Sequence, residues 1–163
     1  MGLWYIPLMP VSTPATLSLD QLPVPYRIFQ HPRPPGSLEQ AARERGQTPE
    51  QVIRSILFRY QKTNFFLTLV AGPGQVSWRK LGLHLGVSRI SLATEAEVLS
   101  VTGYAVGTVS PLGLSSPIPI LADFSVFKPE EVSLGSGVRG VAIIMKSADL
   151  ERTLGKIELG QFC

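Results

Sequence analysis

Two neighbouring apolar runs in the first half of the chain set the strongest limit on its fold. Residues 53–60 and 65–70 are rich in β-branched and aromatic side chains, and the four polar residues 61–64 (Gln-Lys-Thr-Asn) join them. Two such runs separated by a short polar turn are typical of an antiparallel β-hairpin. We therefore expect a β-sheet built around this hairpin.

Short helices and further strands alternate irregularly around the hairpin. Helix starts are predicted at Ser37, Thr48, Ser77, Thr94 and Ser147, where a capping residue precedes an apolar pattern. Strands are expected at 26–29, 89–92, 118–121, 126–127, 132–134 and 141–145. Because helices do not follow every strand, the pattern favours an α+β fold over a doubly wound parallel one. We expect one domain with a mixed, mostly antiparallel, barrel-like sheet and short flanking helices, covering residues 16–163 after a loose extension at 1–15.

The composition excludes several classes of protein. Cys163 is the only cysteine, so the chain has neither an internal disulfide nor a cysteine-based zinc site. The two histidines, His31 and His84, lack metal-ligand spacing. No apolar run approaches the roughly 20 residues of a membrane-spanning helix. We expect a cytoplasmic protein without metal, cofactor or membrane association.

Basic residues gather in the first half of the chain. Residues 1–89 contain ten Arg and Lys against four Asp and Glu, whereas residues 90–163 contain five against eight. An uneven basic surface suits a polyanionic partner such as a nucleic acid. An ordinary solvated surface accounts for the same charges equally well.

Two features carry candidate chemistry. Alternation along the strand at 53–60 places Arg54 on the same side as three apolar residues, where its guanidinium needs an anionic or substrate partner unless it lies at a solvated rim. The segment 103–113 holds three glycines and a proline between a helix and a strand. Such a rigid loop is either structural or presents backbone N–H groups to a carbonyl that becomes an oxyanion. By contrast, Gly-x-Gly-x-x-Gly at 135–140 precedes a strand rather than a helix, and therefore predicts a turn instead of a dinucleotide site.

The loop at 103–113 resembles the YbaK/ProX family of aminoacyl-tRNA deacylases, which is related to the editing insertion domain of bacterial prolyl-tRNA synthetases. The sequence Gly-Tyr-x-Val-Gly-x-x-Ser-Pro-Leu-Gly contains the family's Gly-x-x-x-Pro motif as Gly107 to Pro111. Supporting matches extend the likeness over nearly the whole chain from about Thr16: Pro-Glu-Gln-Val-Ile-Arg-Ser at 49–55, Asp123, residues 137–140 and a final helix through Gly155.

The resemblance implies hydrolysis of the ester between a wrong amino acid and the terminal ribose of tRNA, in trans and without a cofactor. It implies catalytic positions at Arg54, Gly107, Thr108 and Ser110. It implies substrate contacts at Phe29, His31, Ser37, Ser55, Pro111, Asp123, Ser136 and Gly137. The basic half would hold acceptor-stem phosphates, and Asp123 would either bind the substrate amine or cap a strand.

The sequence departs from the family at several of these positions. Arg54 replaces the usual lysine, Ser55 the common threonine, and Thr108 the second glycine of a Gly-Gly pair. Arginine keeps the charge but does not transfer a proton, so an electrostatic role survives the change. We predict a deacylase that acts on proline tRNA carrying cysteine or alanine, as a monomer or weak dimer with prolyl-tRNA synthetase as a partner. The alternatives are an inactive relative that binds tRNA or a nucleotide and acts through a partner protein, and hydrolysis of another small acyl ester.

Overall fold

The predicted hairpin forms the centre of the larger of two sheets in the computed structural model, which describes residues 11–163. Strands β2 (Ile53–Tyr60) and β3 (Asn64–Ala71) pair antiparallel, from Ile53 opposite Ala71 to Tyr60 opposite Asn64. The sheet has the order β4-β2-β3-β5-β8, with β4 (Ser91–Leu92), β5 (Ile120–Asp123) and β8 (Glu158–Gly160). The β3–β5 and β5–β8 pairs are parallel, which makes this sheet mixed.

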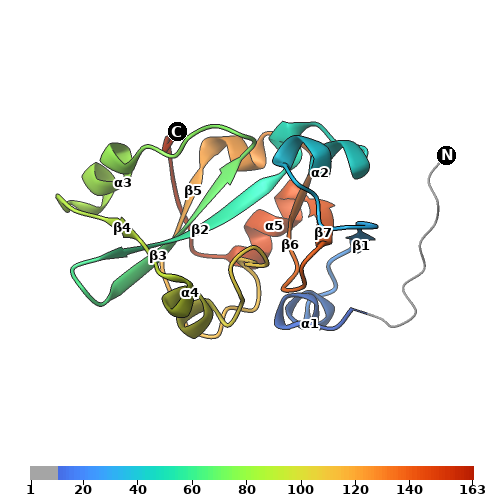
Figure 1. Cartoon of the computed structure of the whole chain (residues 1–163), viewed down its shortest axis with the longest axis horizontal. Coiled ribbons are helices and arrows are strands. Elements are labelled where there is room, and N and C mark those ends of the chain that lie inside the picture. The colour runs from blue at the N-terminus through green and yellow to red at the C-terminus, as the bar shows by residue number, and fades with distance from the viewer. Residues whose placement is uncertain (1–10) are drawn as a thin grey trace.

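The second sheet is antiparallel throughout and has the order β1-β7-β6. Its strands are β1 (Tyr26–Gln30), β6 (Glu131–Gly135) and β7 (Val141–Lys146). Residues 136–140 turn the chain between β6 and β7, as predicted for the glycine-rich motif there. The α+β class with mostly antiparallel strand pairs is confirmed, but the strands form two separate sheets that do not close into a barrel (Figure 1).

Helices flank both sheets and begin where the sequence predicted most of them. Ser37, Ser77 and Thr94 each accept a hydrogen bond on their side-chain oxygen from the backbone N–H three residues later. The helical segments are α1 (Pro14–Gln21), α2 (Leu38–Glu44), η1 (Pro49–Gln51), α3 (Trp78–Leu85), α4 (Glu95–Thr102), η2 (Phe124–Phe127) and α5 (Ser147–Leu154). None of the helices within residues 11–163 is long and apolar enough to cross a membrane.

Three local features differ from the sequence predictions. Helix α1 begins at Pro14, within the extension expected at 1–15, because proline suits the first helical turn and Thr13 caps the helix. The expected strand at 126–127 is part of the 3₁₀ helix η2, which Asp123 caps. Strand β8 was not predicted. The rest of the expected extension, residues 1–10, lies outside the described residues.

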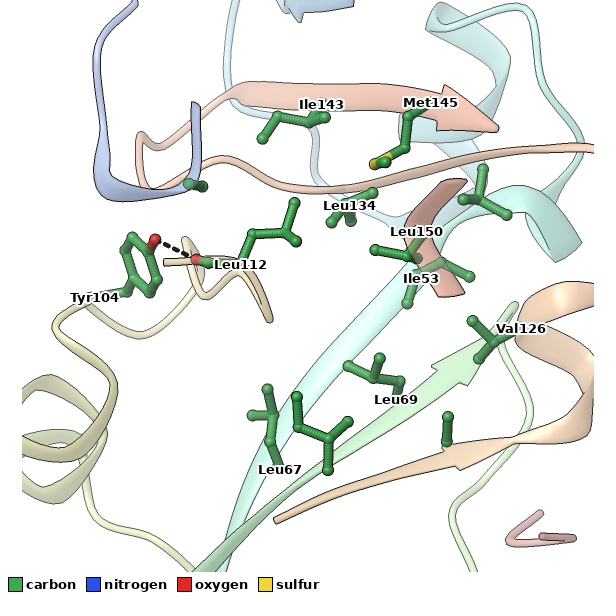
Figure 2. Close-up of a cluster of buried hydrophobic side chains, with 14 of the residues drawn as sticks. Ile53, Leu67, Leu69, Tyr104, Leu112, Val126, Leu134, Ile143, Met145 and Leu150 are labelled. Atoms are coloured by element: carbon green, nitrogen blue, oxygen red, sulfur yellow. Dashed lines mark hydrogen bonds between the residues drawn. The ribbon is translucent and has the colours of Figure 1, made fainter. Parts of the chain in front are cut away.

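The core lies between the two sheets and continues on the outer face of the larger one. Figure 2 shows Ile143 and Met145 of β7 opposite Leu67 and Leu69 of β3, with Leu134 of β6 between them. A second cluster on the other face of the larger sheet contains Phe58, Phe66, Leu81, Leu121 and Phe162. Successive residues of β2 therefore point alternately into the core between the sheets and into the second cluster on the outer face.

Candidate active site

The glycine-rich loop at 103–113 is held in shape by Tyr104. This side chain is buried, and its hydroxyl donates a hydrogen bond of 2.6 Å to the carbonyl of Leu112 (Figure 2). The backbone N–H of Tyr104 donates to the hydroxyl of Thr102 at the end of α4. Burial raises the pKa of Tyr104 to about 12, so its hydroxyl remains a donor at neutral pH. Tyr104 thus fastens one end of the loop to the other.

A tight turn at the exposed rim of this loop leaves two backbone donors available. The N–H of Thr108 donates to the carbonyl of Ala105 at 3.0 Å and closes the turn over Val106 and Gly107. Gly107 has a φ of 89°, a left-handed value that favours glycine at the third position of a turn. No acceptor within residues 11–163 receives the N–H of Val106 or Gly107, and both residues are exposed.

The turn between β6 and β7 packs against this loop and adds a cation. The N–H of Gly137 donates to the carbonyl of Thr108 at 2.9 Å. Arg139 lies over Gly107, with a guanidinium nitrogen 3.6 Å from the position that a Cβ at Gly107 would take. Its Nη2 also donates to the carbonyl of Val106 at 3.4 Å. The loop therefore presents free N–H groups beside a positive charge, an arrangement that stabilises an anionic oxygen.

Residues 29–37 pack against the turn between β6 and β7. The N–H of His31 donates to the carbonyl of Gly140 at 2.8 Å, and Pro34 lies beside Gly140. Three segments are therefore contiguous: 29–37, 103–113 and 135–140. Between them they contain the predicted site residues Phe29, His31, Ser37, Gly107, Thr108, Ser110, Pro111, Ser136 and Gly137.

The buried imidazole of His31 is enclosed by a polar network. Its Nδ1 lies 2.8 Å from a carboxylate oxygen of Glu44, and Nε of Arg45 donates to its Nε2 at 3.1 Å. Arg45 also donates to the hydroxyl of Ser133 at 2.8 Å. Burial lowers the pKa of Arg45 to about 10, which leaves it charged at neutral pH. Both ring nitrogens of His31 are thus engaged inside the protein.

Three of the predicted hydroxyl groups are engaged as well. Thr108 donates to the carbonyl of Ala105, Ser136 donates to the carbonyl of Val141, and Ser110 accepts from the N–H of Leu112. These contacts shape the loop and the turn. Within the loop and the turn, the groups left for a ligand are the backbone N–H groups of Val106 and Gly107 and the guanidinium of Arg139. The sequence analysis gave Arg139 no site role, although the residue stands inside the motif at 135–140.

Arg54 and Ser55 lie on opposite faces of β2. Arg54 shares its face with Phe58 and the second core, and its Nη2 donates to the carbonyl of Gly74. Ser55 shares the other face with Ile53, and its buried hydroxyl has no hydrogen-bond partner within residues 11–163. Since Tyr104 and Leu112 belong to the core on the Ser55 side, Arg54 and the glycine-rich loop lie on different faces of the sheet.

Asp123 lies on the same side of the sheet as Arg54 and holds the last residues of the chain. One carboxylate oxygen accepts from the N–H of Phe162 at 2.7 Å, and the other accepts from the N–H and hydroxyl of Ser125. Burial raises the pKa of Asp123, but the hydrogen bonds from Phe162 and Ser125 outweigh burial and leave this pKa below its usual value. Its carboxylate is therefore charged and fully engaged within the protein.

Backbone donors beside a cation define a class of site found in acyl-transfer hydrolases, where they stabilise the oxyanion of the tetrahedral intermediate. The chain belongs to the aminoacyl-tRNA editing domain family, whose model matches residues 33–153. The match includes the whole glycine-rich loop, Arg139 and Arg54. The resemblance found in the sequence is confirmed.

Relatives of two kinds share sequence with this chain. A multifunctional Ser/Thr-tRNA deacylase, ProXp-y of Escherichia coli K12, is 26% identical over 138 residues, which cover 82% of each chain. A proline–tRNA ligase of Kosmotoga olearia is 37% identical over 79 residues, which are 48% of this chain but 13% of the ligase. The chain therefore spans only a small part of the ligases that it matches.

A solved structure shares the fold over almost the whole chain. A candidate trans-editing enzyme for prolyl tRNA synthetase superposes with a TM-score of 0.82, covering 94% of this chain and 98% of that one, at 23% identity. The mixed α+β architecture of this chain is thus that of a known editing-domain fold.

Proposed function

We propose that this chain hydrolyses the ester of a mischarged tRNA in trans, with proline tRNA carrying alanine or cysteine as its substrate. The observation that supports this most directly is at the exposed residues Val106 and Gly107, whose N–H groups have no acceptor within residues 11–163 and lie beside the guanidinium of Arg139. These groups lie on the loop that carries the family motif.

The proposed reaction uses water as the nucleophile. Water adds to the ester carbonyl carbon, and the carbonyl oxygen becomes an oxyanion that accepts hydrogen bonds from the free N–H groups of the loop. When the intermediate collapses, the bond to the ribose oxygen breaks and this oxygen takes a proton originating from the attacking water. An aminoacyl ester is already activated, so positioning and oxyanion stabilisation account for the acceleration without a protein nucleophile.

The partners follow from the same proposal. The acceptor end of an aminoacyl-tRNA is the substrate, and its 3′-terminal adenosine would lie against the loop from Gly107 to Pro111. The protein would act in the cytoplasm, where prolyl-tRNA synthetase charges tRNA. Sequence shared with proline–tRNA ligases supports the choice of proline tRNA, although the shared region is a small part of those enzymes.

A deacylation panel tests the proposal. Proline tRNA is charged separately with alanine, cysteine, serine, threonine or proline, and loss of each ester is followed with and without protein. Serine and threonine are included because the relative from Escherichia coli is named for them. We expect faster loss of the alanine or cysteine ester, with the proline ester spared. Equal loss of every ester with and without protein would overturn the proposal.

Gly107→Ala separates catalysis from binding. Alanine at a φ of 89° strains the turn by about 1–2 kcal/mol and shifts the donors that face the ester. We expect turnover to fall by up to about 100-fold, the lower end of the loss seen when an oxyanion donor is removed, while affinity for uncharged tRNA is unchanged. The readouts are single-turnover deacylation and tRNA binding by anisotropy.

Gly46→Ala is the matched control for this variant. Gly46 has a φ of 69° and open space at its Cβ position, and it lies after α2, outside the loop. The control has comparable backbone strain and is expected to keep full turnover. A Gly107→Ala protein with turnover equal to that of Gly46→Ala would refute the oxyanion role.

A further inference from the structure

A hollow of about 1190 Å³ opens at the tip of the β2–β3 hairpin, away from the glycine-rich loop. It lies between the end of β2, the hairpin turn, the first turn of α3 and the segment between α3 and β4. Figure 1 shows these elements together at one end of the molecule, while the β1-β7-β6 sheet occupies the other end. We call this hollow the basic groove and define it by Arg59, Tyr60, Lys62, Trp78, Arg79 and Arg89.

Four cations line the basic groove, and three of them lack an acidic partner in the described structure. Arg59 pairs with Glu97 at 3.1 Å. Lys62, Arg79 and Arg89 are exposed, and no carboxylate within residues 11–163 forms an ion pair with them. None of the residues lining the hollow is acidic. A concave surface with like charges attracts a polyanion, because bound anionic groups relieve the repulsion between the cations.

An exposed aromatic ring lies among these charges. Trp78 is 46% exposed at the edge of the groove. Its ring packs edge-on against the buried Phe58, with centroids 5.5 Å apart and planes at 86°. The contact holds the indole on one side, while nearly half of the residue stays accessible to solvent. Cations that bind phosphates, together with an exposed aromatic ring that stacks a base, are typical of surfaces for single-stranded nucleic acid.

The backbone of the hairpin turn adds an independent sign of function. Gln61 and Lys62 have φ values of 49° and 67°, left-handed conformations that cost non-glycine residues of order 1–3 kcal/mol. A turn selected only for stability would use Asn or Gly at such positions. The chain instead keeps a lysine there, at the edge of the groove.

We propose that the basic groove binds the phosphodiester backbone of RNA and that Trp78 stacks an unpaired base. The inference rests on the proposed function in one respect, namely that this RNA is the tRNA whose ester reaches the glycine-rich loop. Because the groove and the loop lie on different elements, the two surfaces would contact different parts of one tRNA. Groove contacts would then set affinity, and the loop would set turnover.

Charge reversal in the groove tests the phosphate contacts. We expect Arg79→Glu/Arg89→Glu to weaken binding of uncharged proline tRNA about tenfold or more, and to reduce the slope of log affinity against log salt by about 2. The control is Lys128→Glu/Lys156→Glu, which changes the net charge equally at two exposed positions outside the groove. Equal affinity and salt slope in the two double variants would overturn the proposal.

Fluorescence of Trp78 tests the stacking contact without removing the side chain. In a Trp4→Phe background Trp78 is the only tryptophan, and we expect tRNA to quench its emission. Trp78→Ala should lower affinity about 5- to 100-fold. Unquenched emission at saturating tRNA would refute stacking, even if Trp78→Ala loses affinity by disturbing its contact with Phe58.

The same variants separate this inference from the proposed function. If the protein deacylates a mischarged tRNA, Arg79→Glu/Arg89→Glu should raise KM and leave kcat unchanged. Loss of tRNA binding in this variant, together with no deacylation by the natural protein, would support the groove and overturn the proposed reaction. Active deacylation with KM unchanged in the groove variant would overturn the groove alone.

Discussion

At the scale of single residues, Tyr104 is a buried side chain that holds the two ends of the candidate site's loop together. Its hydroxyl is buried and bonded to the carbonyl of Leu112. We expect Tyr104→Phe to lower the free energy of unfolding by about 1–2 kcal/mol, because a buried carbonyl loses its donor. Tyr26→Phe is the matched control, since that hydroxyl donates to Asp20 at an exposed position. Urea denaturation of both variants measures the difference, and equal losses would contradict the anchoring role of Tyr104.

The residue types at the site were predictable from the sequence, but the hydrogen bonds that their side chains make were not. The motif identified the loop, and Gly107 does occupy a turn that favours glycine. Nothing in the sequence shows that the hydroxyls of Thr108, Ser110 and Ser136 bond to backbone groups nearby in the chain, because those bonds depend on the irregular backbone conformation of the loop and the turn. Arg139 was missed for a different reason: its contact with Gly107 arises only when two segments about 30 positions apart in the sequence pack together.

At the scale of elements, the segment after β8 depends on Asp123. This carboxylate accepts from the N–H of Phe162 and from Ser125. Asp123→Asn should lower the free energy of unfolding by about 1–3 kcal/mol at pH 7, since hydrogen bonds to a charged acceptor are the stronger kind. Because folding lowers the pKa of Asp123, its contribution to the free energy of unfolding depends on pH. The contribution is fully present at pH values above the usual pKa near 3.8 and is lost as the pH falls through the lower pKa of the folded protein.

Urea denaturation of this variant at pH 7 and near pH 3 checks that sign. The difference between Asp123→Asn and the natural protein should shrink at the lower pH. Glu151→Gln, the same chemical change on an exposed side chain, should show little difference at either pH. An Asp123→Asn effect that is equally large at both pH values would show that packing, rather than charge, carries the contribution.

Long or strongly capped elements could be predicted, whereas short ones depended on their surroundings. The hairpin and the helices after Ser37, Ser77 and Thr94 have local signals that agree with their tertiary roles. Strand β8 has three residues, two of them exposed, and exists because it pairs with β5. The segment at 126–127 has the composition of a strand, but the cap at Asp123 starts a 3₁₀ turn before it.

At the scale of the whole molecule, both sheets contribute to one core, and the division into two sheets was not visible in the sequence. Leu134 of β6 is buried in that core together with Leu67 and Leu69 of β3. Trp78 reports on the opposite face of the larger sheet through its contact with Phe58. A change in β6 therefore reaches Trp78 only if the sheets unfold together.

Leu134→Ala tests that coupling. The cavity should lower the free energy of unfolding by about 2–5 kcal/mol. Because one core joins the sheets, far-UV circular dichroism and Trp78 fluorescence in the Trp4→Phe background should shift to the same lower denaturant midpoint. Leu17→Ala, at a side chain that is 51% exposed in α1, should leave both midpoints nearly unchanged. If circular dichroism shifts while the Trp78 transition stays in place, the larger sheet folds without the smaller one, and the glycine-rich loop would then lose its β6–β7 support separately from the basic groove.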